Sequence, residues 1–286
     1  KNLINEYNSD IANIIKTYQM YRRDSLDELK YDMEYYKKYN CNLVPKLVRG
    51  AYWHSEYKQG HLFTDKKDTD NNYNKAIRLC YNYNNPYNIL ATHNKNKKLE
   101  LVNLFSGLEI NILGLDQFPS IGEIDEIGTT LHENAFIKAH EVHKITGLPT
   151  LADDTGLEVD LLNGAPGVYS ARYAGINSSY EDNVNKLLLD LSQYGNEIER
   201  TARFKTVISF INNGQEFSEI GIVEGYITIK RTGENGFGYD SIFKPVNSMK
   251  TFAQMSEIEK NKISHRRLAF DKIKDKIIKE FKKESI

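Results

Sequence analysis

One stretch, from Thr130 to Ala152, constrains the fold most tightly, because it specifies a helix, both of its ends and the strand that follows. Thr130 and Glu133 form a capping box at the start of this predicted helix. Gly147 supplies its stop signal, and a strand is predicted over residues 150–152. The predicted buried face consists of Ala135, Phe136, Ala139 and Val142. A helix that leads directly into an apolar strand is typical of an α/β fold.

Helices and strands alternate along the rest of the chain as well. Further helices are predicted over residues 24–39, 74–83 and 266–283, and further strands near 43–49, from residue 86, and over 204–211 and 222–229. The last helix is amphipathic through Ile273, Ile277 and Phe281. The whole chain is therefore predicted to be α/β.

Composition excludes several function classes. The chain has 286 residues and a net charge of -1, so no overall field attracts a nucleic acid polymer or an acidic membrane surface. No apolar segment reaches the roughly 18 residues of a membrane helix, and no signal peptide pattern is seen. Cys41 and Cys80 form no CxxC pair, which argues against a disulfide framework or zinc site and fits a reducing compartment. We predict a cytoplasmic protein.

Two adjacent carboxylates, Asp153 and Asp154, stand in the segment LADDTGLEVD, residues 151–160. At the end of the predicted strand, like charges this close are costly unless a cation binds or a proton is shared. Mg²⁺ is the simplest such cation. A polar turn closed by Asp-Thr-Gly explains the same residues without a metal, and a capping box alone explains Glu133. The pattern leaves both interpretations open.

The loop from Thr92 to Lys97 joins a predicted strand to a predicted helix. Backbone N–H groups and the positive end of the helix dipole favour phosphate at such a junction. The loop also offers a hydroxyl, a carboxamide and lysines, but it lacks the glycines of a P-loop. It is a candidate phosphate-binding loop, with a polar strand end as the alternative.

Two segments near the C-terminus carry candidate base-binding groups. In GENGFGYD, residues 233–240, Phe237 offers a surface on which a planar base could stack, although a tight turn has the same composition. In KNKISHRR, residues 260–267, cations and His265 gather at a helix start, against the preference of the helix dipole. An anionic or carbonyl partner accounts for this cluster, and so does a solvated basic face.

His140 and His143 lie three residues apart on the helix that follows Thr130. They lack the HExxH spacing of a zinc protease. We predict a surface or packed pair.

Taken in order, these segments resemble the inosine triphosphate pyrophosphatase family, which hydrolyses abnormal purine nucleoside triphosphates. The resemblance covers about residues 91–279 and includes THNKNKKLE, TTLHENAFIKA, GLPTLADDTGLEVDLLNGAPGVYSARYAG, FGYD and ISHR. It implies an elongated mixed sheet with flanking helices, a central cleft between two lobes, and a homodimer. The implied reaction is attack of water on the α,β-phosphoanhydride, which yields pyrophosphate and the nucleoside monophosphate.

The same resemblance implies roles for individual residues. Those implied to hold the triphosphate or the sugar are Thr92, Asn94, Lys97 and Thr155. Glu133 and Asp154 would bind Mg²⁺, and Asp154 would also be the catalytic base. Those implied to bind the base or adjoin it are Phe237, Gly238, Tyr239, Asp240, Lys260, His265 and Arg266. Donors aimed at a 6-oxo group would favour ITP, dITP and XTP over adenine nucleotides; the pattern locates no device that excludes guanine.

The residues before about 94 resemble a different family, proline dehydrogenase. Residues 17–56 include YQMY and KLVRGAYW, which end successive strands of that family's flavin-binding β/α barrel. By this resemblance Gln19 and Arg49 would face FAD. The first strands and the C-terminal helix with its substrate-binding arginines have no counterpart. A partial barrel leaves strand edges open and cannot enclose a flavin.

The sequence thus predicts two domains, a proline dehydrogenase-like partial β/α-barrel fragment over residues 1–85 and a nucleoside triphosphate pyrophosphatase domain over 86–286. The segment ILATHNKNKKLE, residues 89–100, fits both families. We interpret it as the point at which two genes were joined, either by recombination or by an error in assembling or predicting the gene. His93 stands where the pyrophosphatases more often have Gly or Asn, so its bulk is expected to weaken triphosphate binding. The predicted function is Mg²⁺-dependent hydrolysis of non-standard purine nucleoside triphosphates; FAD-dependent proline dehydrogenase is the alternative.

Overall fold

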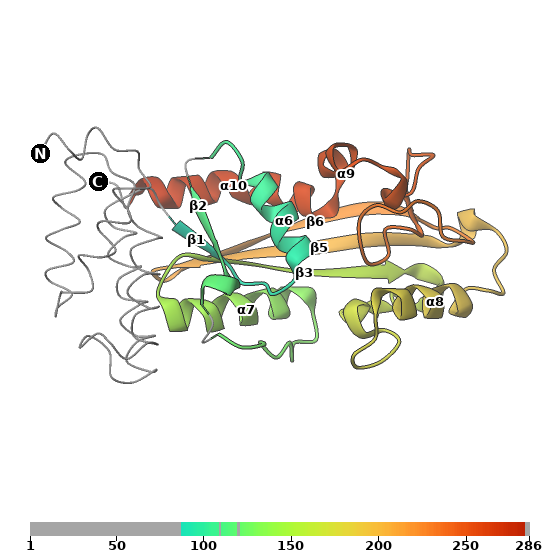
Figure 1. The fold of residues 1–286 in the computed structure, drawn as a ribbon, viewed down its shortest axis with the longest axis horizontal. Coiled ribbons are helices and arrows are strands. Elements are labelled where there is room, and N and C mark those ends of the chain that lie inside the picture. The colour runs from blue at the N-terminus through green and yellow to red at the C-terminus, as the bar shows by residue number, and fades with distance from the viewer. Residues whose placement is uncertain (1–86, 109, 119–120, 284–286) are drawn as a thin grey trace, which may run out of the picture.

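The computed structural model describes residues 87–108, 110–118 and 121–283. The elements predicted before residue 86, together with Gln19, Arg49, Cys41 and Cys80, lie outside the described residues. Within these residues the fold is mixed α/β, with helices flanking one seven-stranded sheet (Figure 1). No helix in the described ranges is long and apolar enough to cross a membrane.

The sheet is mixed, as the family resemblance implied. Its order is β2, β1, β3, β5, β6, β7, with β4 paired to β3 outside this path. Strand β1 runs parallel to β2 and to β3, whereas the remaining pairs are antiparallel. The strands are β1 Tyr87–Leu90, β2 Asn111–Gly114, β3 Thr150–Val159, β4 Pro166–Gly167, β5 Thr201–Asn212, β6 Gln215–Ile227 and β7 Phe243–Pro245. The three long strands β3, β5 and β6 run along the long axis of the molecule (Figure 1).

Strand β3 is longer than the sequence predicted. It continues past Ala152 to Val159, so Asp153 and Asp154 lie inside the strand rather than at its end. The Asp-Thr-Gly segment forms no turn, because every residue from Thr150 to Val159 is paired with β5. Gly156 permits the approach of β4: a Cβ atom at this position would lie 2.6 Å from the carbonyl oxygen of Gly167.

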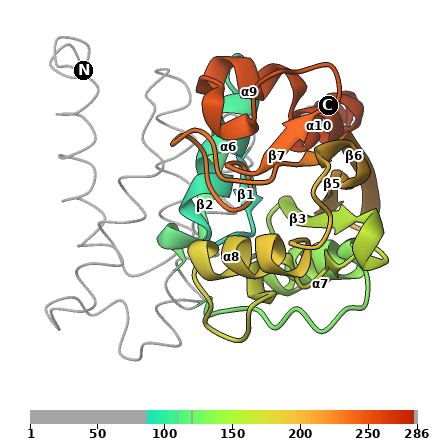
Figure 2. The same cartoon turned by 90° about the vertical axis from the view of Figure 1, so that its right-hand side faces the viewer.

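Helices cover both faces of the sheet. Figures 1 and 2 show α7 and α8 on one face and α10 on the other. The helices are α6 Lys95–Leu104, α7 Leu131–Thr146, α8 Tyr180–Asp190, α9 Glu257–Ile263 and α10 His265–Lys283. The capping box of Thr130 and Glu133 and the left-handed Gly147 bound α7 as predicted. Its predicted buried face was partly wrong, because Phe136 is only half-buried and Asn134 and Lys138 are buried instead.

Two large apolar cores occupy opposite halves of the long sheet. One contains Leu151 of β3 together with residues of α6, β5 and α10, including Ile273, Ile277 and Phe281, as predicted. The other contains Leu157 of β3 with residues of α8, β5, β6 and β7. Alternate residues of a strand share a face, so Asp153 and Thr155 lie on this face between Leu151 and Leu157. The fold therefore places a polar segment of β3 between two apolar cores.

Candidate active site

A cavity of about 250 Å³ adjoins this polar segment of β3. It is also lined by the start of α6, by the turn over residues 233–240, and by the junction of α9 and α10. The predicted site residues that line it are Thr92, Asn94, Lys97, Asp154, Thr155, Phe237, Gly238, Tyr239, Asp240, Lys260, His265 and Arg266. The structure thus brings together every predicted substrate-binding residue of the pyrophosphatase domain.

One end of the cavity is the loop that starts α6. Asn94 is the N-cap of this helix, and its Oδ1 accepts hydrogen bonds from the backbone N–H groups of Asn96 and Lys97 at 3.0 and 3.2 Å. The Thr92 hydroxyl accepts from the Asn94 N–H at 3.2 Å. His93 is exposed, and its Nε2 lies 3.0 Å from the Gly122 carbonyl oxygen. The positive end of the helix therefore adjoins the cavity, as a phosphate site requires.

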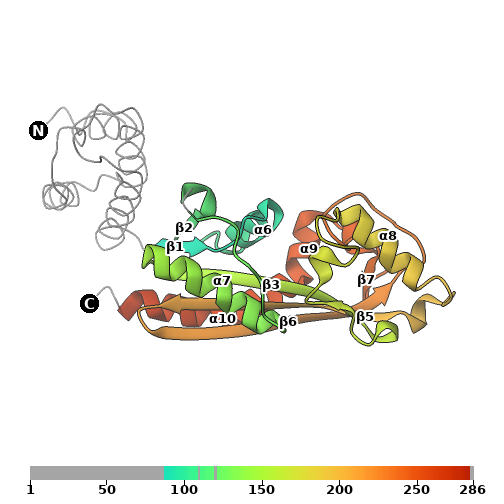
Figure 3. The ribbon, with the colours of Figure 1, turned by 90° about the horizontal axis from the view of Figure 1, so that it is seen from below.

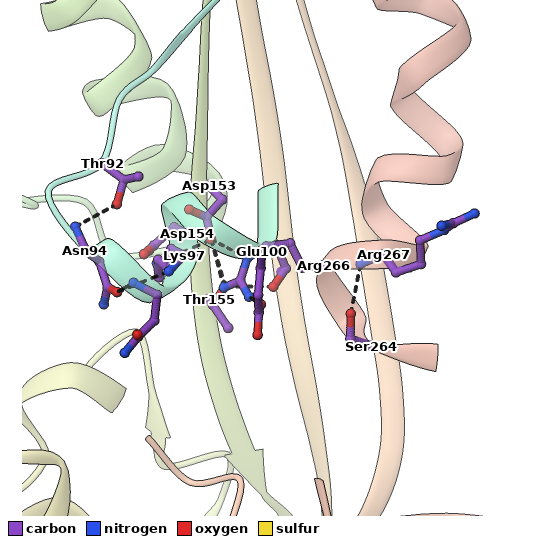
Figure 4. A network of polar contacts seen from close by, with 12 residues as sticks. Thr92, Asn94, Lys97, Glu100, Asp153, Asp154, Thr155, Ser264, Arg266 and Arg267 are labelled. Atoms are coloured by element: carbon purple, nitrogen blue, oxygen red, sulfur yellow. Dashed lines mark hydrogen bonds and ion pairs between the residues drawn. The ribbon is translucent and has the colours of Figure 1, made fainter. Parts of the chain in front are cut away.

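Asp153 is held among cations on the α6 and α10 side of β3. Its Oδ2 lies 3.4 Å from Lys97 Nζ and accepts hydrogen bonds from Arg266 Nε and Nη2 at 3.2 and 3.1 Å (Figure 4). The Thr155 hydroxyl donates to the same oxygen at 3.2 Å. Burial acts to raise the pKa of Asp153, but the charges of Lys97 and Arg266 outweigh it and hold the pKa well below its usual range. Asp153 is a permanently ionised anchor.

Asp154 lines the cavity and has a different environment. Its Oδ1 accepts from Lys138 Nζ at 3.2 Å, and Lys138 also donates to Glu126 at 2.7 Å. Its Oδ2 is buried without a hydrogen-bond partner among the described residues. Burial raises the pKa of Asp154, and the opposing charge of Lys138 does not cancel this effect. A carboxylate with a raised pKa at a cavity wall is a typical general base.

Glu100 links the phosphate end of the cavity to its other end. It is buried on α6, where it forms an ion pair with Arg266 and accepts a hydrogen bond from Lys260 Nζ at 2.8 Å. Lys260 also donates to Asp240 at 2.6 Å. Figure 4 shows Glu100, Arg266 and Asp153 converging, while the side chain of Arg267 points away from them. Of the two arginines in the predicted basic cluster, Arg266 is therefore buried and Arg267 points away from the network.

The other end of the cavity is aromatic. The turn over residues 233–240 is closed by Asp240, whose carboxylate accepts from the Phe237 N–H at 2.8 Å. Gly236 fits here because its φ is 76° and a Cβ atom would lie 2.1 Å from that carboxylate. Lys260 Nζ lies 4.9 Å from the centre of the Phe237 ring. Tyr239 faces the core and donates its hydroxyl to the Ser170 carbonyl at 2.9 Å.

His265 extends this aromatic surface. Its ring stacks on Phe204 with centroids 4.5 Å apart and an interplanar angle of 18°. Burial is the main cause that holds the pKa of His265 well below its ordinary value, so the ring is neutral. Its Nδ1 is buried without a hydrogen-bond partner among the described residues. The ring therefore keeps one unpaired polar atom beside a planar apolar surface.

Glu133, the other predicted metal ligand, does not line this cavity. Its carboxylate accepts from the Thr129 N–H and hydroxyl at 2.6 and 2.9 Å and from the Thr130 N–H at 3.1 Å. These bonds hold it at the start of α7. Its role in metal binding stays a prediction.

Sequence reasoning missed four charged residues of the site, Glu100, Glu123, Glu126 and Lys138. Both Glu123 and Glu126 line the cavity. Lys138 could have been found from the helix periodicity, because it lies three residues after Ala135 and next to Ala139 on the apolar face of α7. An unpaired lysine on such a face is rare. Glu100 had no such signal, because its partners Lys260 and Arg266 are more than 150 residues away in the sequence.

His140 and His143 make separate contacts. The His140 Nε2 atom lies 3.4 Å from a Glu216 carboxylate oxygen, and His143 Nδ1 lies 2.7 Å from the Leu148 carbonyl oxygen. Across the part of the chain that the structure describes, no three His, Cys, Asp or Glu side chains are grouped as a metal site.

Comparison with known proteins agrees with the fold and the cavity described above. The Ham1 family model matches residues 88–276, and the chain belongs to this family. The dITP/XTP pyrophosphatase of Thermoanaerobacter pseudethanolicus is 46% identical over 192 residues, which cover 67% of this chain and 96% of the relative. A solved HAM1 protein from Coxiella burnetii is 39% identical, with a TM-score of 0.62 over 68% of this chain and 98% of its own. The Staphylococcus aureus Ham1 protein is 38% identical, with a TM-score of 0.61 over 68% and 99%.

A second family model overlaps the first. The proline dehydrogenase model matches residues 1–112, which confirms the predicted resemblance of the front segment. The overlap with the Ham1 match, residues 88–112, contains β1, α6 and the start of β2. These elements form a parallel β-α-β unit, the unit from which β/α barrels are also built. Here β1 pairs with β3, so the shared unit is part of the Ham1 sheet.

Proposed function

We propose that this chain hydrolyses non-standard purine nucleoside triphosphates, ITP, dITP and XTP, to the nucleoside monophosphate and pyrophosphate. Asp154 carries this proposal, because it combines a place on the cavity wall, a raised pKa and a buried oxygen without a partner. Relatives named dITP/XTP pyrophosphatase support the same substrate class. The phosphates would lie against the start of α6, and the base against the aromatic end.

The residues of the site divide the work of the reaction. The N–H groups that start α6 and the Lys97 ammonium would bind and orient the phosphates. Asp154 would accept a proton from the water that attacks the α-phosphorus, and Lys138 would hold its carboxylate in place. Asp153 would keep Arg266 and Lys97 charged and fixed. Pyrophosphate leaves as the α,β bridging oxygen takes the electron pair of the broken P–O bond.

The donor set fits Mg²⁺. Among the described residues, the charge network beside the cavity contains five cations, Lys97, Lys138, Arg172, Lys260 and Arg266, and five carboxylates, Glu100, Glu126, Asp153, Asp154 and Asp240. It has no surplus positive charge for a triphosphate. The unpartnered Oδ2 of Asp154 is the kind of oxygen ligand that Mg²⁺ prefers, and substrate phosphates would supply further ligands. The ion would supply charge neutralisation of the phosphates when bound.

Selectivity for the base would come from the aromatic end. Planar surfaces are offered by Phe237 and by the stacked rings of His265 and Phe204. Polar atoms are offered by the neutral His265 ring and the Lys260 ammonium. A donor aimed at a 6-oxo group meets the amino group of adenine as donor against donor. A site built in this way can reject the wrong base by about 10⁴-fold.

The test is product analysis with the full chain. Incubation of ITP with the protein and Mg²⁺ should release inosine monophosphate and pyrophosphate in equal amounts, and EDTA should stop the release. Free orthophosphate would indicate cleavage at the β,γ bond instead. Absence of both products from cooperatively folded protein would refute the proposal.

We also propose that residues 1–85 take no part in this reaction. The proline dehydrogenase match ends within the Ham1 match and covers less than half of the chain, and the sequence lacks the arginine pair that would bind proline. Deletion of residues 1–85 should leave kcat for ITP unchanged. A proline-dependent reduction of a dye, with bound yellow flavin, would contradict this division. The predicted homodimer and cytoplasmic location stay predictions.

A further inference from the structure

Tyr180 is the first residue of α8 and lines the cavity. Its backbone position is fixed by a capping box, in which the Ser179 hydroxyl accepts from the Asp182 N–H and the Asp182 carboxylate accepts from the Ser179 N–H. The helix is anchored one turn later by Asn183, which is buried and accepts from the Ala174 N–H at 2.7 Å. The tyrosine therefore projects from a rigid support.

The side chain of Tyr180 touches both ends of the cavity. Its hydroxyl accepts a hydrogen bond from Asn94 Nδ2, the N-cap of α6, at 2.9 Å. Its ring meets the Phe237 ring with centroids 5.9 Å apart and an interplanar angle of 45°. The Oδ1 atom of the same Asn94 caps α6, so one carboxamide connects Tyr180 to the phosphate end.

The Tyr180 ring does not pack into an apolar core within the described residues. It belongs to none of the buried clusters, and 43% of the residue is exposed. The Tyr180 and Phe237 rings are tilted by 45° rather than stacked, and both residues line the cavity. Aromatic faces that are fixed and half-exposed at a cavity wall are typical stacking surfaces for nucleic acid bases.

We propose that Tyr180 contacts the purine base of the substrate, as a second aromatic surface beside Phe237. This inference rests on the proposed function, because it assigns the aromatic end of the cavity to a base. The base would cover the exposed ring face, while the hydroxyl stays bonded to Asn94. Tyr180 is thus a determinant of affinity for nucleotides that carry a base, and it contributes nothing to the binding of bare phosphates.

The test compares Tyr180→Ala and Tyr180→Phe with wild type in the full chain. Tyr169→Ala is the matched control, since Tyr169 is an exposed tyrosine close in sequence that does not line this cavity. Calorimetry with Mg²⁺ measures the dissociation constants of inosine monophosphate, which carries a base and is not hydrolysed, and of inorganic triphosphate, which has none.

We expect Tyr180→Ala to weaken inosine monophosphate about tenfold, which corresponds to about 1.4 kcal/mol, and to leave inorganic triphosphate within twofold. Tyr180→Phe and Tyr169→Ala should bind both ligands as wild type does, and all three variants should melt cooperatively. Unchanged affinity of Tyr180→Ala for inosine monophosphate would overturn the inference. An equal loss for both ligands would also overturn it, because Tyr180 would then act on the phosphate end through Asn94.

Failure of this inference is separable from failure of the proposed function. If wild-type protein binds inosine monophosphate but releases no pyrophosphate from ITP, the proposed reaction is refuted. The Tyr180 contact is then still decided by the affinity of Tyr180→Ala for inosine monophosphate. Wild-type protein that hydrolyses ITP, with unchanged binding in Tyr180→Ala, refutes the contact alone.

Discussion

The two sides of strand β3 use the same residue type in opposite ways. On the α6 and α10 side, Asp153 is surrounded by donors, and the charges of Lys97 and Arg266 lower its pKa. On the α7 side, Asp154 has one cation, shares it with Glu126, and keeps a raised pKa. Only Asp154 of the two lines the cavity. The difference teaches that two adjacent identical residues can acquire opposite pKa shifts from their surroundings, which is the basis of the proposed division between scaffold and chemistry.

The largest effect on stability is expected on the α6 and α10 side of β3, when a carboxylate is removed from the buried ion pairs. Glu100→Gln removes the carboxylate that pairs with Arg266 and Lys260, both of which are buried. Arg266 keeps Asp153 and Lys260 keeps Asp240 as partners, but each cation loses one of its two carboxylates. Loss of these two charged hydrogen bonds should cost about 3 kcal/mol. Urea unfolding should show this loss in the free energy of unfolding. Glu259→Gln is the control, because its pair with Lys250 is exposed and should contribute little. Equal stability of the two variants would show that the Glu100 network is not structural.

An intermediate effect is expected on the α7 side of β3, where Asp154 is the proposed general base. Lys138→Gln removes the strongest charge that opposes burial at Asp154, so the pKa of Asp154 should rise further. A general base acts only when it is unprotonated, so the acid limb of kcat/KM should move to higher pH, with activity on that limb about tenfold lower. Lys186→Gln, which breaks a half-buried pair with Asp190 outside the cavity, should leave the profile in place. A shift of the acid limb to lower pH would contradict the assigned role of Asp154.

The smallest effect is expected at His93, contrary to the expectation from sequence that its bulk weakens the phosphate loop. His93 lines the cavity, but it is exposed and its Nε2 lies 3.0 Å from the Gly122 carbonyl oxygen. Its φ is not in the left-handed region. Asn94 rather than His93 caps α6. His93→Gly should change KM for ITP by less than about threefold, and His93→Ala separates loss of the ring from added backbone freedom. A tenfold lower KM in both variants would show that the ring does obstruct the phosphates.

Local patterns predicted most of the elements of this fold. The capping box at Thr130, the stop at Gly147 and the buried face of the last helix all act within a few residues, so the sequence reveals them. The end of β3 was wrong for a tertiary reason. Asp153 and Asp154 have the composition of a turn, but ion pairs with Lys97, Arg266 and Lys138 make their burial within a strand tolerable.

The candidate site was predicted mainly through family resemblance, and the structure explains why spacing alone was insufficient. Thr92, Asp154, Phe237 and His265 come from four separate segments that the cavity brings together. Tyr180 escaped prediction because a tyrosine at the first position of a helix has no distinctive pattern, and only its contacts with Asn94 and Phe237 place it at the site. Spacing alone did not distinguish the roles of Asp153 and Asp154, because their opposite pKa shifts depend on remote cations. Only the family resemblance assigned the base to Asp154.

The division between Asp153 and Asp154 is the central claim, and one paired measurement tests it. Asp153→Asn and Asp154→Asn are compared in two assays, urea unfolding at pH 7 in EDTA and kcat for ITP in Mg²⁺. A raised folded-state pKa means that ionised Asp154 opposes folding at neutral pH, whereas a lowered pKa means that ionised Asp153 favours it.

Asp154→Asn should therefore lower kcat about 10³-fold and remain within about 1 kcal/mol of wild-type stability or exceed it. Asp153→Asn should lose about 3–5 kcal/mol of stability, because Lys97 and Arg266 lose their shared anion. Near-normal kcat in Asp154→Asn, or wild-type stability in Asp153→Asn, would contradict the account.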